Sequence, residues 1–113
     1  MMEEKINLDR YQELANRSAG AGGQGERRIM VAALGLAGEA GEFANLVKNM
    51  TAHGHSFDSQ ALKDELGDVL WYLAEAATAS GLDLNEIAQE NVEKLLKRYP
   101  EGFSQESSIN REA

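Results

Sequence analysis

The residues of this sequence best suited to chemistry are two pairs of carboxylates. Glu39 and Glu42 lie three residues apart, and Glu65 and Asp68 repeat that spacing further along the chain. Residues three apart on an α-helix project in nearly the same direction, so each pair can present its two carboxylates together. Four carboxylates in a partly dehydrated groove would repel one another unless a cation compensated them. Such oxygen ligands suit Mg²⁺, with Mn²⁺ as its substitute.

Both acidic pairs are predicted to lie on helices, beside apolar stripes. Apolar side chains recur at intervals of three and four over residues 26–50, and again from Ser59, which can cap the helix, to near Gly81. Acids at the edge of two such stripes would meet if the helices packed against each other. An ordinary solvated acidic face is the alternative interpretation, and spacing alone does not decide between the two.

The remaining elements complete an all-α chain. A first helix is predicted over residues 5–19, and a fourth opens at a capping box around Asp83 and ends before Pro100. Four glycines in residues 20–25 predict a flexible loop, and the polar segment 101–113 predicts an irregular tail. No period-2 strand, repeat or second domain is visible. We therefore expect a single domain over residues 1–113 with a four-helix architecture.

The second predicted helix carries an unusual run of glycine, GLAGEAGE, over residues 35–42. Each glycine inside a helix costs about 1 kcal/mol relative to alanine. We expect Gly38 and Gly41, which flank Glu39, to let the helix approach its neighbours closely while leaving space for ligands.

A stripe of polar side chains on the fourth predicted helix could contact phosphate. Asn91, Lys94 and Arg98 fall at i, i+3 and i+7, and arginine offers a bidentate fork to phosphate oxygens. Lys48 could add a further cation after Glu42. The alternative is that Lys94 and Arg98 interact with the negative end of the helix dipole.

Composition narrows the classes of partner. The chain has 113 residues and a net charge of −8, which opposes binding to nucleic-acid polymers and anionic membranes. It has no cysteine, so disulfides and zinc–thiolate sites are excluded. We find no signal-peptide pattern and no apolar stretch approaching the ~20 residues of a membrane span, so a cytoplasmic location without membrane contact is expected.

These motifs together resemble the MazG-like nucleotide pyrophosphohydrolases of the all-α NTP pyrophosphatase superfamily. The resemblance runs through GLAGEAGEFANLVKN (35–49), DELGDVLWYLAEAATASGLDL (64–84) and NVEKLLKRYPEGF (91–103), in the order found in that family. It implies a MazG-like four-helix bundle completed by assembly into a homodimer or homotetramer.

The resemblance also implies roles for particular residues. The positions that match the family's catalytic Mg²⁺ ligands are Glu39, Glu42, Glu65 and Asp68, and those that match its nucleotide- and phosphate-contacting helix are Asn91, Lys94, Arg98 and Tyr99. Many members carry a further glutamate where this sequence has Gly38. That departure leaves open which residue activates the attacking water.

The implied reaction is the hydrolysis of a nucleoside triphosphate to the monophosphate and pyrophosphate, with divalent ions offsetting the phosphate charge. Phosphoribosyl-ATP pyrophosphohydrolase activity is a neighbouring alternative in the same superfamily. A non-enzymatic helical interaction module, using the acids for solubility or partner contact, is an alternative of a different class.

Overall fold

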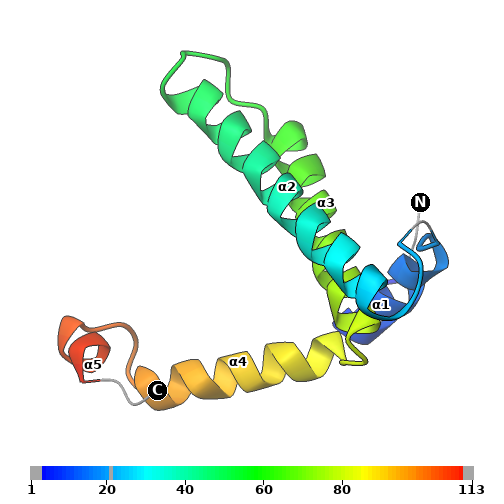
Figure 1. Ribbon diagram of the computed structural model, residues 1–113. Helices are drawn as coiled ribbons and strands as arrows, with labels where there is room; N and C mark the ends of the chain where they lie inside the picture. The colour runs from blue at the N-terminus through cyan, green and yellow to red at the C-terminus, as the bar shows by residue number, and fades with distance from the viewer. Residues whose placement is uncertain (1–3, 21, 111–113) are drawn as a thin grey trace.

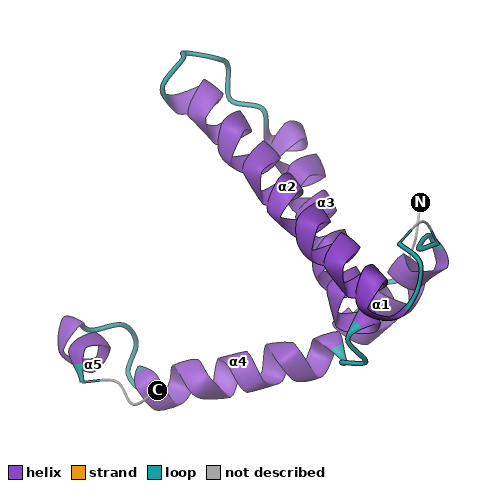
Figure 2. Cartoon of the chain, viewed as in Figure 1, coloured by secondary structure: helices purple, strands orange, loops and turns teal. Residues whose placement is uncertain are grey.

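The computed structural model describes residues 4–20 and 22–110, and every regular element in these ranges is a helix (Figure 2). The predicted all-α class is therefore confirmed. The helices are α1 (Leu8–Arg17), α2 (Gly25–Thr51), α3 (Ser59–Ala79), α4 (Leu84–Arg98) and a short α5 (Gln105–Ile109).

The starts of three helices follow from side-chain caps. The carboxamide of Asn7 and the carboxylates of Asp58 and Asp83 each accept the backbone N–H three residues ahead, at 2.8, 3.0 and 3.1 Å. Such caps satisfy N–H groups that have no partner inside the helix. Two predicted boundaries were wrong for this reason: α1 begins after Asn7 rather than at Lys5, and Asp58 rather than Ser59 caps α3.

Two irregular segments also differ from expectation. The tail was predicted to be irregular, but residues 105–109 form α5. The predicted loop over 20–25 is shorter, because Gly25 is already the first residue of α2. Ala21, in the same loop, lies outside the described residues. The flexibility of this loop stays a prediction.

The helices form an antiparallel pair with two additions at one end (Figure 1). α2 and α3 lie side by side, α1 packs near the C-terminal end of α3, and α4 projects away from the pair. The buried cluster is small, comprising Ala15, Ala74 and Leu84, with Leu8, Tyr11 and Trp71 packed against it. The radius of gyration is 17.0 Å, whereas a compact chain of this size has about 13 Å. This single chain is therefore an open structure rather than a closed bundle.

One described helix, α2, is long and apolar enough to cross a membrane by length and composition alone, which corrects the expectation that no stretch approaches a span. The helix nevertheless carries Glu39 and Glu42 and packs along α3. Charged side chains at the middle of a lipid-facing helix are costly. A single helix of this kind is weak evidence for a membrane span, because the core helix of a soluble protein and a signal sequence pass the same test of length and composition.

Candidate metal centre

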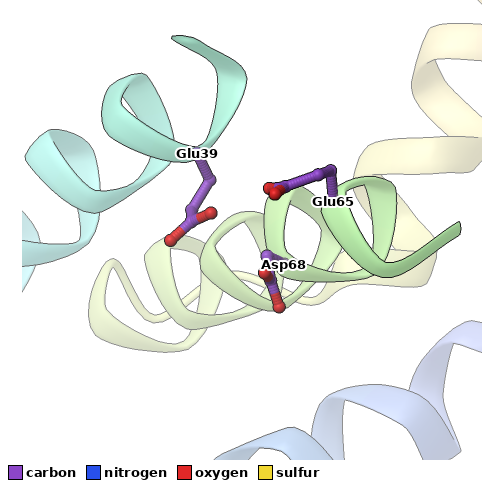
Figure 3. Close-up of side chains that lie close together, drawn as sticks. All are labelled: Glu39, Glu65 and Asp68. Atoms are coloured by element: carbon purple, nitrogen blue, oxygen red, sulfur yellow. The ribbon is translucent and has the colours of Figure 1, made fainter. Parts of the chain in front are cut away.

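Three of the four predicted carboxylates meet between α2 and α3. Glu39 reaches from α2 toward Glu65 and Asp68 on α3 (Figure 3). Each residue offers one carboxylate oxygen, and the three oxygens lie within 4.8 Å of one another. Because Glu65 and Asp68 are three apart on one helix, they share a face, and the pairing of α2 with α3 adds Glu39.

Glu65 has the most perturbed environment of the three. Its side chain is half-buried, and its Oε2 is shielded from solvent without a hydrogen-bond partner. Burial raises the pKa of Glu65, and the negative charges of Glu39, Glu42, Asp68 and Asp64 raise it further. A carboxylate oxygen without a donor, surrounded by like charges, is electrostatically unsatisfied.

This donor set fits a hard divalent cation. All the available ligand atoms are carboxylate oxygens, which Mg²⁺ and Mn²⁺ prefer, and a cation would supply the missing partner of Glu65 Oε2. Asp68 is exposed, so the group is open to solvent and to a ligand. Glu42 lies outside the group of three, yet its charge still acts on Glu65.

The glycines of α2 contribute differently from what we expected. A Cβ at Gly38 or Gly41 would have no neighbour within 4 Å apart from the adjacent backbone of α2. Within the described chain, neither glycine is therefore needed for close packing of another helix. Gly35 does so instead, because a Cβ there would overlap the ring of Tyr72 on α3. The close contact of the helix pair therefore lies one turn before Glu39, and the surface around Gly38 and Gly41 is open.

The predicted phosphate-contacting residues are distributed over two helices. Lys48 is exposed in the last turn of α2, on the same helix as Glu39. The others belong to α4 and its C-cap, which project away from the α2–α3 pair (Figure 1). Asn91 and Lys94 are exposed, Arg98 is half-buried with its Nε lacking a partner, and the ring of Tyr99 lies 5.4 Å from that of Phe103.

Two features near the centre were not anticipated. The pKa of the Tyr11 phenol on α1 is raised by burial, and the negative charge of Asp68 raises it further. Farther along α3, buried Glu75 pairs with Arg28 of α2 at 2.6 Å, and Arg28 also donates to Asn16 of α1. No local pattern in the sequence indicates that Tyr11 lies near Asp68 or that Arg28 pairs with Glu75.

The fold and this cluster define an all-α protein with three carboxylates that could hold a metal ion between two antiparallel helices. A match to the MazG nucleotide pyrophosphohydrolase domain covers residues 29–103, which is more than half of the chain. The chain therefore belongs to the MazG nucleotide pyrophosphohydrolase family, as the resemblance predicted.

The matched range contains most of α2 and all of α3 and α4, with all four predicted carboxylates, whereas α1 precedes it. The chain is also similar to the Gene 37 protein of Mycobacterium phage L5, with 35% identity over 114 residues. That alignment covers 94% of this chain and 100% of the phage protein. No solved structure matches the chain.

Proposed function

We propose that the protein hydrolyses ribo- or deoxynucleoside triphosphates to the monophosphate and pyrophosphate in a Mg²⁺-dependent reaction. The observation that carries the proposal is the group of three carboxylates, with the unpartnered oxygen of Glu65, in a chain of the MazG family. The carboxylates of the centre favour a cation over an apolar ligand, and a bound cation would in turn attract the phosphates of a nucleotide.

Glu39, Glu65 and Asp68 would hold the metal, and Glu42 would extend the acidic edge toward solvent. When bound, a divalent ion offsets phosphate charge and lowers the pKa of water. The cationic side chains Lys48, Lys94 and Arg98 would bind the phosphate oxygens, and Asn91 and Tyr99 would contact the rest of the nucleotide.

We also propose that a second copy of the chain completes the site, in a homodimer or homotetramer. α4 projects away from the α2–α3 pair of its own chain, so we propose that the α4 of another copy supplies the phosphate-binding side chains. Large apolar side chains support this assembly, because they remain exposed on two helices: Ile29, Met30 and Leu34 of α2, and Val92, Leu95 and Leu96 of α4. Light scattering should give at least twice the 12.3 kDa mass of one chain.

The decisive experiment is a panel of the eight common NTPs and dNTPs with Mg²⁺ or Mn²⁺, in which monophosphate and pyrophosphate are both measured. Equal amounts of the two products are expected. Asp68→Asn and Glu42→Gln should keep the helical circular dichroism signal and lose turnover. The matched control is Glu26→Gln, which neutralises an exposed acid in the first turn of α2.

Release of orthophosphate, or an active Glu42→Gln/Asp68→Asn double variant, would refute the proposal. Faster pyrophosphate release from phosphoribosyl-ATP than from any NTP would identify the neighbouring activity instead. The non-enzymatic alternative predicts neither saturable Mg²⁺ binding nor a thermal shift with a non-hydrolysable dNTP analogue.

A further inference from the structure

The side chain of Gln12, on α1, is hydrogen-bonded to the turn between α3 and α4. Its Nε2 donates to Thr78 Oγ1 at 3.0 Å and to the carbonyl oxygen of Leu82 at 2.9 Å. Its Oε1 accepts the backbone N–H of Leu84 at 2.8 Å. Both ends of one amide are therefore used, and the three partners span the last turn of α3, the connection and the first residue of α4.

These hydrogen bonds satisfy backbone groups that the two helices leave without partners. Leu84 is the first residue of α4, and its N–H has no acceptor within the helix. The Asp83 cap accepts a different N–H, that of Glu86. The connection also turns sharply, with Gly81 at a φ of +70°. Gln12 thus ties α1 to the short connection between α3 and α4 through three hydrogen bonds.

The direction of α4 depends on few other contacts. Leu84, only 3% exposed, is the buried residue of this helix, and it packs beside Ala15 and Ala74. Beyond its first turn α4 extends away from the α2–α3 pair (Figure 1), with Ile87, Val92, Leu95 and Leu96 exposed. The N-cap Asp83 is also hydrogen-bonded to Asp9 of α1. Because these contacts of α4 gather at its base, the groups that hold the base orient the helix.

We infer that Gln12 is a positioning residue that sets the direction of α4 and, through it, the placement of the nucleotide-binding side chains on that helix. The second part of this inference rests on the proposed function. The first part is a property of the fold and is measured without any substrate.

The direction of α4 can be measured between spin labels at Lys63→Cys on α3 and Lys97→Cys on α4, both exposed positions in a chain with no native cysteine. Labelled chains are diluted into an excess of unlabelled chains, so that only distances within one chain contribute. One narrow distance distribution is expected, and Gln12→Met should broaden or shift it. The control is Gln60→Met, which loses an amide that donates to Asp64 on the same helix at 2.9 Å.

Kinetics separate positioning from a merely structural role. Losing hydrogen bonds of ordinary strength should raise the KM for the nucleotide about tenfold in Gln12→Met. The affinity for Mn²⁺ at the carboxylates should not change.

An unchanged distance distribution in Gln12→Met would overturn the inference, as would an equal effect of Gln60→Met. A lowered Tm with unchanged KM and distance would likewise reduce Gln12 to a stabilising residue and refute its positioning role. Wild-type protein that binds Mn²⁺ but hydrolyses no nucleotide would refute the proposed function, while the distance measurement would still decide whether Gln12 orients α4.

Discussion

Gly35→Ala is the substitution that tests the α2–α3 contact most directly. The added Cβ would overlap three ring atoms of Tyr72, namely Cε1, Cδ1 and Cζ. The ring has little freedom to yield, because Tyr72 is half-buried and its ring packs edge-on against Trp71, with centroids 5.0 Å apart. The two helices must separate or Tyr72 must change rotamer.

The expected magnitude is the difference of two opposing contributions. Overpacking typically costs about 1–3 kcal/mol, and an overlap with a ring belongs at the upper end. Replacing glycine by alanine within a helix returns about 1 kcal/mol. The net loss should be about 2 kcal/mol, which lowers Tm by about 8 °C in a domain of this size. Gly38→Ala, which meets no neighbour, should instead gain up to about 1 kcal/mol.

Urea and thermal unfolding of the two variants at equal protein concentration measure this contrast. In a Tyr72→Ala background the overlap is absent. Gly35→Ala should therefore lower the free energy of unfolding less in that background than in the wild-type chain. Equal stability of Gly35→Ala and Gly38→Ala would refute the register of α2 against α3 described above. A loss of stability in Gly38→Ala would favour the proposed oligomer, with a second copy of the chain covering that glycine.

Three further substitutions test other parts of the structure. Glu65→Gln should weaken Mn²⁺ binding, followed by electron paramagnetic resonance, at least about tenfold, and an unchanged affinity would exclude Glu65 as a ligand. Arg28→Met leaves the buried Glu75 carboxylate without its ion pair and should cost about 3 kcal/mol in urea unfolding; a loss of only a few tenths would show that the pair is solvated. The pKa of Asp9 is raised because its carboxyl group is hydrogen-bonded to Asp83 and partly desolvated. The protonated form of Asp9 therefore stabilises the fold at low pH. This contribution is lost as the pH rises through the raised pKa. Asp9→Asn keeps a donor to Asp83 at every pH and should flatten that part of the Tm profile, whereas an unchanged profile would exclude the pair.

The accuracy of the sequence-based predictions follows the range of the interactions involved. Helix positions were recovered to within a few residues, because periodicity and capping are local. The caps show the limit of that information, since Asp58 and Ser59 are both good N-caps and only the backbone geometry selects Asp58. The polar tail contains α5, which the sequence did not predict because this segment has no apolar periodicity.

The candidate site divides in the same way. The i, i+3 spacing placed Glu65 and Asp68 on one face, and the structure brings Glu39 to them. Spacing could not distinguish Glu39 from Glu42, because both lie beside the apolar stripe of α2. The register of α2 on α3 makes that choice, and it is held at Gly35 and Tyr72 rather than at the glycines next to the acids.

By itself, the sequence determined the helical class, the helix boundaries to within a few residues, the acidic pairs and the membership of the MazG family. Only the tertiary structure decided which three carboxylates meet, which glycine admits a neighbour and where α4 points. Local hydrogen bonding and side-chain periodicity specify a helix, so they can be read along the chain. The direction of α4 depends on contacts such as that between Gln12 and Leu84, 72 residues apart, which exist only after the chain has folded.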